Sequence, residues 1–323
     1  MAKFRKNHNK ADSSASGGMV TKVGIFVAIL GALFWGFSQF TGGGGDINEA
    51  IENASDILNG TPPKTSENSG SGSPGIPTVL GNMLPTSTTG QIINHEFYSL
   101  SYSEEHEQAE WVAYELTKES LIVPNVKRTG NFRPDPKVSK ASASDRDYRG
   151  SGYDRGHMAP AGDMAFSKNA MSQTFYMSNM SPQIRNFNGG IWRELEENVR
   201  DWAYQNKHLY VVTGPVLKGA MQEQIGHNRV SVPKTYYKVI LDYTEPEAKA
   251  IAFLMDNEIS YQPLDKYAVT IDEVEALTGI DFFHALLDDE TEERLESSFN
   301  VRKWKLDNKT FQIRKDKWNK RRQ

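Results

Sequence analysis

The chain has 323 residues, of which 38% are hydrophobic and 24% are charged, enough to form one large domain or two ordinary ones. Its formal net charge of −4 argues against a protein that coats nucleic acid along its length, because such proteins carry a broad basic face. The sequence contains no cysteine, which excludes disulfides, thiolate metal sites and cysteine nucleophiles.

The first 40 residues have the pattern of a membrane anchor. Residues 1–22 form a basic head, and residues 23–40, VGIFVAILGALFWGFSQF, carry no charge. As a helix this stretch would extend roughly 27 Å, close to the thickness of the bilayer core. A cleaved signal peptide is the alternative, but its apolar region is normally shorter and no small-residue cleavage site follows. We expect an uncleaved single-pass anchor with a cytoplasmic N-terminus and the rest of the chain outside, in the periplasm or at the cell surface.

Three further segments follow the anchor. Residues 41–80 are rich in Gly, Ser and Pro and predict a flexible linker, or stalk. Residues 81–301 have the composition of a folded domain. Residues 302–323 form a basic C-terminal tail that would either attract a polyanion or be a solvated terminus docking on the acidic segment 288–296.

The patterning within 81–301 predicts a mixed α+β domain. Runs rich in β-branched and aromatic residues predict strands at 208–213, 236–243 and 248–255. Apolar residues at three- and four-residue spacing predict a helix at 190–205, and a second helix begins at Ile271. Because strands and helices do not alternate regularly, an α+β fold is favoured over a doubly wound one.

The run Asp154-Arg155-Gly156-His157 is the segment that indicates chemistry. Glycines precede it and Pro160 closes it, a composition more typical of a shaped surface than of a core. His157 is the side chain here that can transfer a proton near neutral pH. A lone histidine is often structural, so its neighbours must decide its role.

Two polar residues lie downstream of this run. Asn188 stands beside two glycines just before the predicted helix, where asparagine is usually an N-cap. Its carbonyl oxygen could equally bind a hard cation such as magnesium, which keeps most of its waters. Glu196, about two turns into the helix, could accept hydrogen bonds from such waters or lie on a solvated helix face.

The run from Tyr153 to Pro160 resembles the signature of the DNA/RNA non-specific endonucleases, which are ββα-metal enzymes. Other segments resemble further blocks of that family in the same order: 128–135, 175–183, 188–196, 210–215, 232–234 and 277–283. The resemblance implies a ββα-metal nuclease fold, in which two strands and a helix lie on an antiparallel central sheet flanked by helices. It also implies metal-dependent endonuclease cleavage of DNA, RNA or both without sequence specificity.

The resemblance also implies roles for individual residues. His157 corresponds to the general base and Asn188 to the ligand of magnesium, with manganese as the alternative metal. Glu196 corresponds to the carboxylate that holds water around the metal, and Asn179 to a residue that positions the base.

Two arginines complete the implied site. Arg128 corresponds to the arginine that contacts the substrate phosphate, with Lys127 and Arg133 as neighbouring alternatives. Arg155 lies inside the signature itself. Positive charge here favours a polymeric polyanion as the substrate.

Two other functions remain open from the sequence. One is a metal phosphodiesterase that acts on smaller substrates, and the other is a non-catalytic surface module that binds DNA. The remaining histidines have no ligand-like spacing and are interpreted as structural or surface residues.

Overall fold

The computed structural model describes residues 83–219, 221–244 and 246–320. The predicted anchor at 23–40 and the whole of the predicted linker at 41–80 lie outside these residues. Within the described part of the chain, no helix is long and apolar enough to cross a membrane.

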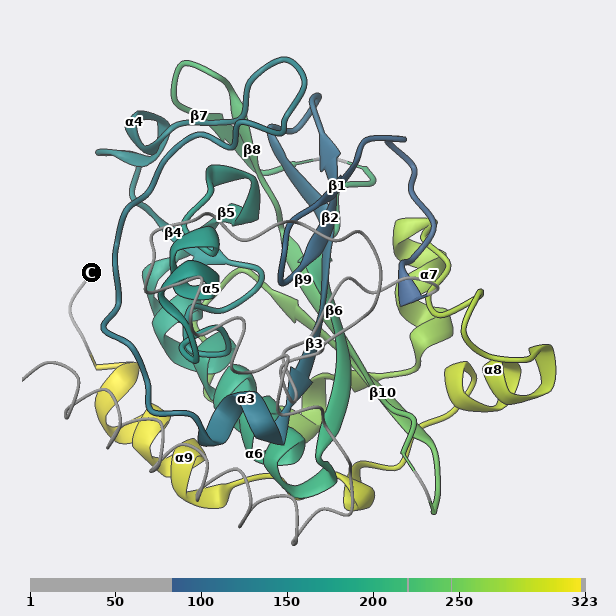
Figure 1. The fold of residues 1–323 in the computed structure, drawn as a ribbon. Helices are drawn as coiled ribbons and strands as arrows, with labels where there is room; N and C mark the ends of the chain where they lie inside the picture. Colours follow the sequence, from purple (N-terminus) through teal and green to yellow (C-terminus); the bar gives the residue numbers. More distant parts are fainter. Residues whose placement is uncertain (1–82, 220, 245, 321–323) are drawn as a thin grey trace, which may run out of the picture. The chain divides into compact units, whose positions relative to one another are not determined.

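A seven-stranded sheet runs through the centre of the described domain (Figure 1), with every neighbouring pair antiparallel. The predicted strands at 208–213, 236–243 and 248–255 are confirmed, and they correspond to three strands of this sheet, at 208–215, 235–242 and 249–256. In spatial order the sheet contains β1 (Ile92–Asn94), β2 (Ser99–Ser103), β3 (Gln108–Thr117), β6 (His208–Pro215), β9 (Thr235–Asp242), β10 (Lys249–Asp256) and β11 (Ala268–Val269).

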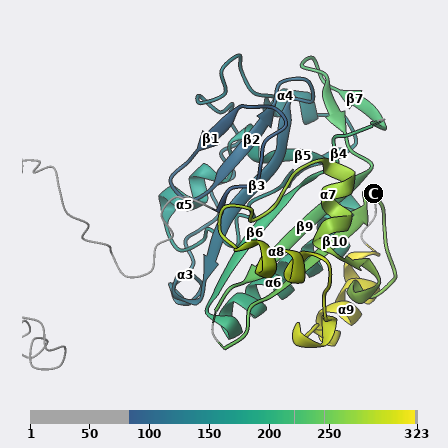
Figure 2. The same cartoon turned by 90° about the vertical axis from the view of Figure 1, so that its right-hand side faces the viewer.

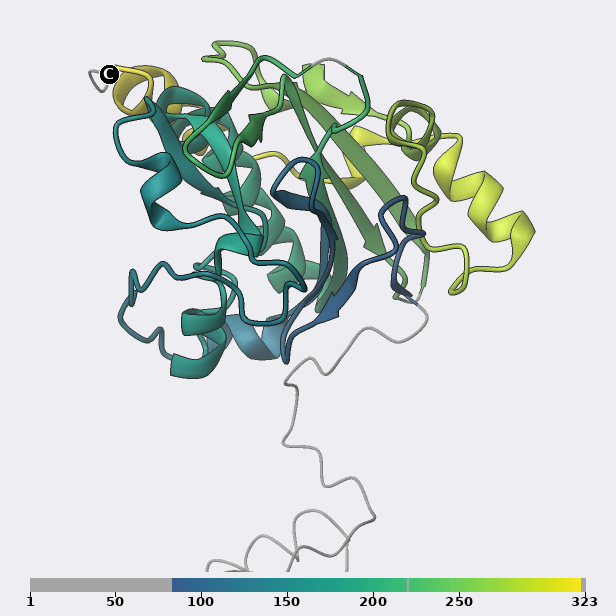
Figure 3. The same ribbon diagram turned by 90° about the horizontal axis from the view of Figure 1, so that it is seen from above.

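Both faces of this sheet are covered. Side chains along a strand alternate between the two faces, so Tyr236 and Ile240 of β9 pack on the side of α6 (Arg193–Asn206). Tyr237 and Val239, at the alternate positions, pack on the opposite side. There α7 (Ile271–Thr278) and α8 (Asp289–Glu296) cover the sheet (Figures 2 and 3). The domain therefore has three layers, with two separate apolar cores.

The predicted helices are confirmed. Leu195, Val199 and Trp202 of α6 are all buried, which is why their spacing gave a helical pattern. The helix α7 begins with a capping box between Thr270 and Glu273 and ends at Gly279, whose φ of +77° suits glycine.

Two strands outside the central sheet carry the signature run. β4 (Tyr153–His157) pairs antiparallel with β5 (Met180–Ile184), and a wide π-type turn, η3 (Phe187–Trp192), connects β5 to α6. This order of two strands and a helix, together with the antiparallel sheet, fits a ββα-metal nuclease fold.

The remaining elements are short. They are α3 (Lys118–Ile122), α4 (Asp145–Tyr148), α5 (Lys168–Gln173), η2 (Met177–Asn179), η4 (Leu264–Tyr267), η5 (Val301–Lys303) and the hairpin of β7 (Glu223–Ile225) with β8 (Val230–Val232).

The C-terminal residues differ from the predicted solvated tail. α9 (Asn308–Ile313) and η6 (Arg314–Trp318) pack against α6 and η3 rather than docking on segment 288–296. Arg314 is fully buried, and its guanidinium pairs with Glu194 of α6. Removing one partner of a buried ion pair typically lowers the free energy of unfolding by about 3–5 kcal/mol. The C-terminal segment is therefore part of the folded domain.

Candidate active site

His157, the last residue of β4, is held between strands and aromatic rings. It pairs with Met180 of β5 and is only 8% exposed. Its ring packs edge-on against Phe175 at 5.0 Å between centroids, and Phe132 lies 6.0 Å away. The imidazole therefore has one fixed orientation.

This environment keeps His157 neutral. Burial, reinforced by the positive charge of Arg128, lowers the pKa of His157 to about 3, although a hydrogen bond with the backbone of Arg155 acts in the opposite direction. Its Nε2 is buried and has no hydrogen-bond partner among the described residues. The ring is therefore neutral near pH 7, and the lone pair of its Nε2 is free to accept a hydrogen bond.

The glycines in and before this strand are required by its packing and by the backbone conformation of its approach. A Cβ atom at Gly156 would lie 2.2 Å from the buried side chain of Gln183 on the paired strand. Gly150 and Gly152, in the approach to β4, have φ values of +74° and +87°, which other residues rarely adopt. The glycine-rich approach is thus a backbone requirement.

Asn179 fixes the chain that follows His157. It is fully buried, and its Oδ1 accepts the N–H of Ala159 at 2.8 Å. Its Nδ2 donates to the carbonyls of Ala159 at 3.0 Å and Thr174 at 2.9 Å. All of these partners are backbone groups, so Asn179 positions the strand that carries His157 and does not itself face outward.

Asn188 lies in the turn η3 and does not cap α6. The N-cap position belongs to Trp192 and has no side-chain cap, so the N-cap interpretation of Asn188 is wrong. Instead, its Nδ2 donates to the carboxylate of Asp154 at 3.2 Å. Asp154 belongs to the signature run, but the sequence did not predict a separate function for it.

The oxygens around Asn188 fit a hard cation. The side chain of Asn188 contacts Asp154 through its Nδ2. Its Oδ1 has no hydrogen-bond partner in the described part of the chain. Amide and carboxylate oxygens are the ligands that magnesium and manganese prefer. Asn188 and Asp154 are therefore the residues here that could hold a divalent metal ion.

Glu196 projects from α6 into a buried cluster of charges. Burial raises its pKa, while the positive charges of Lys238, Arg200 and Arg128 oppose that shift. Arg128 thus acts electrostatically on both His157 and Glu196. These three side chains belong to one site, although within the described residues no hydrogen bond or ion pair joins Asn188 to His157 or Glu196.

Three members of this cluster, Lys238, Arg200 and Asp163, were not predicted from the sequence. Lys238 of β9 is fully buried on the α6 side of the sheet, and its Nζ, 4.9 Å from the ring of Trp192, has no hydrogen-bond partner among the described residues. Arg200 pairs with Asp163 at 2.7 Å. A single lysine inside an apolar strand, and an arginine four residues after Glu196, were the available sequence signals.

The two predicted arginines are placed differently. Arg128 is exposed, and its guanidinium stacks on Phe175 at 4.8 Å, beside the histidine. Arg155 packs on Phe132 at 4.9 Å and contacts Asp145 at 2.6 Å, so its charge is already paired.

The neighbouring alternatives to Arg128 do not share its position. Arg133 stacks on Tyr176 at 3.9 Å and donates to the backbone carbonyl of Ser172 at 2.9 Å. Lys127 is exposed and makes no contact with the histidine. Of the three cations, Arg128 is the one whose charge acts on His157.

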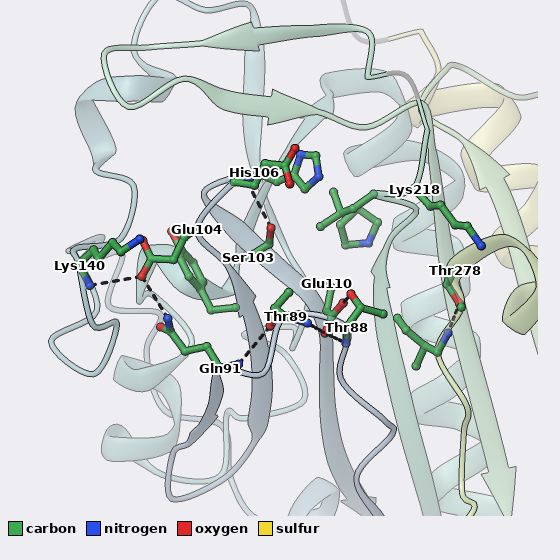
Figure 4. A pocket seen from close by; sticks show the side chains of 16 residues that line it. Thr88, Thr89, Gln91, Ser103, Glu104, His106, Glu110, Lys140, Lys218 and Thr278 are labelled. Carbon is green, nitrogen blue, oxygen red and sulfur yellow. Dashed lines mark hydrogen bonds between the residues drawn. The ribbon is translucent and has the colours of Figure 1, made fainter.

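A cavity of about 650 Å³ lies elsewhere, beside β2 and β3 (Figure 4). None of the predicted site residues lines it. Glu110, the acid in its wall, accepts hydrogen bonds from Ser101 and from the N–H of Thr88, so its carboxylate serves to hold the N-terminal segment. The candidate site is instead the surface around His157, which suits a long polymer better than a small enclosed ligand.

The comparisons with known proteins agree with this fold. The family model of the DNA/RNA non-specific endonucleases matches residues 77–289. The chain belongs to this family.

Individual relatives extend over most of the described domain. The chain is 37% identical over 202 residues to the mitochondrial nuclease EXOG of Danio rerio, covering 58% of this chain and 59% of that protein. It is 36% identical to nuclease C1 of Cunninghamella echinulata, covering 62% and 85%. It thus spans less than two thirds of the length of the EXOG relative.

A solved structure has a similar fold. The crystal structure of an EndoG/EndoGI complex matches with a TM-score of 0.57 and 34% identity, covering 61% of this chain and 87% of that one.

Replacement of Asn179 tests its positioning role. Asn179→Ala removes three hydrogen bonds and leaves buried backbone groups unsatisfied, so we expect a loss of about 2–4 kcal/mol in the free energy of unfolding. Denaturant unfolding measures it. Asn169→Ala on the exposed surface is the control, expected to change stability by less than about 0.5 kcal/mol. Equal effects of the two substitutions would contradict the role given to Asn179.

Proposed function

We propose that the chain is a divalent-metal-dependent endonuclease that hydrolyses phosphodiester bonds of DNA, RNA or both without reading sequence. The observation that carries the proposal is the buried, neutral imidazole of His157, with its unpartnered Nε2 beside the exposed guanidinium of Arg128. Membership of the nuclease family supports it.

In this mechanism His157 is the general base. Its Nε2 accepts a proton from a water molecule as that water attacks the phosphorus, and the low pKa ensures that the base form is present. Arg128, exposed beside it, binds the phosphate electrostatically and keeps the phosphorus within reach of the attacking water. Asn179 contributes indirectly, by fixing the strand that holds the base.

Asn188 and Asp154 would hold the metal ion, and Glu196 would orient water next to it. Magnesium, or manganese in its place, would supply positive charge against the negative charge that develops on the phosphoryl oxygens and the leaving 3′-oxygen. The positive charges of Lys238 and Arg200 favour the ionised form of Glu196, which is the form that accepts hydrogen bonds from water.

A site of this kind has no means of reading bases. The groups assigned to the substrate are a guanidinium and a metal site, both of which act on phosphate. No recognition helix or strand is assigned to a groove, so cleavage without sequence preference follows from the contacts proposed.

We also propose that residues 23–40 anchor the chain in a membrane, with the nuclease domain on the extracytoplasmic side. The support is the uncharged 18-residue stretch and the basic residues before it. After alkaline carbonate extraction, the full chain is expected to stay with the membrane, and a variant lacking 23–40 is expected to be released. Release of the full chain would contradict the anchor.

The His157→Ala substitution tests the mechanism. Since a positioned base contributes roughly 10²–10⁴-fold to a rate, we expect the cleavage of supercoiled DNA and of RNA to fall by that factor with folding unchanged. Cleavage is measured with magnesium and with excess chelator. His227→Ala, an exposed histidine, is the matched control and should cleave at the wild-type rate.

The other outcomes distinguish the competing functions. Wild-type rates in His157→Ala would exclude this base, and full activity in chelator would exclude the metal. Hydrolysis of bis-p-nitrophenyl phosphate without cleavage of either polymer would indicate a phosphodiesterase for small substrates. DNA binding without metal-stimulated cleavage would indicate a binding module.

Lys238→Met tests the buried charge beneath Glu196. The ammonium lowers the pKa of Glu196, so its removal should raise that pKa and shift the acidic limb of the pH–activity profile to higher pH. His157 does not set this limb, because with a pKa of about 3 it stays neutral throughout. The measurement is kcat/KM against pH. Lys234→Met, an exposed lysine nearby, should leave the limb in place. An unmoved limb in Lys238→Met would contradict the coupling.

A further inference from the structure

Three carboxylates meet on the face of the sheet opposite to α6. Asp272 and Glu275 lie three residues apart on α7, which places them on one side of that helix. Glu296, at the end of α8, projects toward them, and one oxygen of each carboxylate lies within 4.8 Å of the others. This cluster lies in the layer of α7 and α8 (Figure 2), whereas Met158, the neighbour of His157, packs in the core on the other side of the central sheet.

Glu296 is the unusual member of this group. It is only 6% exposed, and its Oε1 is buried without a hydrogen-bond partner among the described residues. A buried carboxylate oxygen with no donor is unfavourable, because the water it loses on folding is not replaced. The site therefore lacks a positively charged or hydrogen-bonding partner for this oxygen.

Nearby negative charges make the burial of the Glu296 carboxylate still less favourable. Burial, together with nearby carboxylates that include Glu275 and Glu292, raises the pKa of Glu296 to about 9. Burial likewise raises the pKa of Glu275 to about 7, although its Oε1 accepts the N–H of Phe282 at 2.9 Å. None of the ion pairs in the described part of the chain involves the three clustered carboxylates.

We propose that Asp272, Glu275 and Glu296 bind a calcium ion that joins α7 to α8. Calcium takes oxygen ligands at 2.3–2.6 Å, so two ligands of one ion lie at most about 5 Å apart, and three oxygens that all lie within 4.8 Å of one another meet this limit. Three carboxylates suit calcium better than magnesium, which demands near-ideal octahedral geometry and is usually bound through one or two carboxylates. Asp272 is exposed, which leaves one side of the site open to the waters that complete the coordination.

The bound ion would stabilise the folded domain. The three ligands come from two helices, and α8 is otherwise held through Leu295 and its contacts with α7 and β10. An ion that binds the native chain and not the unfolded one raises the unfolding temperature with its concentration. The site is therefore structural and acts independently of the proposed nuclease reaction.

Thermal unfolding of the full chain, stripped of metal and titrated with calcium, tests this site. Calcium at 100 times its Kd should raise the Tm of the wild type by on the order of 5 °C. Glu296→Gln should raise the Tm without calcium, because an amide avoids the cost of neutralising and burying a carboxylate, and should abolish the calcium-dependent rise. Glu275→Gln should also abolish the rise, and it provides the test if Glu296→Gln fails to fold.

Two controls separate this site from the nuclease centre. Glu293→Gln removes a charge from an exposed position of α8 and should retain the full rise. Asn188→Ala, on the opposite side of the sheet, should retain it too. The same rise in Glu296→Gln and in the wild type would overturn the proposal, as would its loss in Asn188→Ala or its absence from the wild type. None of these readouts depends on nuclease activity.

Discussion

The candidate site depends on the burial of one imidazole. His157 ends a strand of a two-stranded sheet, so the short β4–β5 ladder alone would leave it free to move. The hydrogen bonds of Asn179 to the backbone on either side, and the ring of Phe175 against the imidazole, remove that freedom. The same burial lowers the pKa of the imidazole, so a single packing arrangement determines both its position and its protonation state.

Charge at the site is organised in two layers. Arg128 lies at the surface, where it can meet a phosphate, and Lys238 lies beneath Glu196 at the centre of the sheet. A fully buried ammonium without a hydrogen bond opposes folding, and perturbed buried groups of this kind are concentrated at functional sites. Because both cations lower the pKa of Glu196, that carboxylate can remain ionised in an environment where burial alone would favour its neutral form.

The sequence predicted the features that depend on residues close together in the chain. The periodicity of Leu195, Val199 and Trp202 records the burial of one helix face, so the helix could be read from the sequence. The N-cap alternative for Asn188 was wrong, and its contact with Asp154, 34 residues away, could not be predicted from the sequence because it depends on the pairing of β4 with β5. The burial of Lys238 could not be predicted, because one charged residue in a strand does not show whether the sheet face on which it lies is covered.

The C-terminal segment shows how a distant part of the chain supports the turn η3. It lies beyond residue 289, where the family match ends, yet Trp318 stacks under Arg193 at 4.1 Å and a Cβ at Gly190 would lie 3.0 Å from the Oδ1 of Asn319. The Arg314–Glu194 pair, 120 residues apart in sequence, holds this segment against the start of α6. Since η3 carries Asn188 and leads directly into α6, the orientation of the proposed metal ligand depends on residues whose composition resembles that of a solvated basic tail.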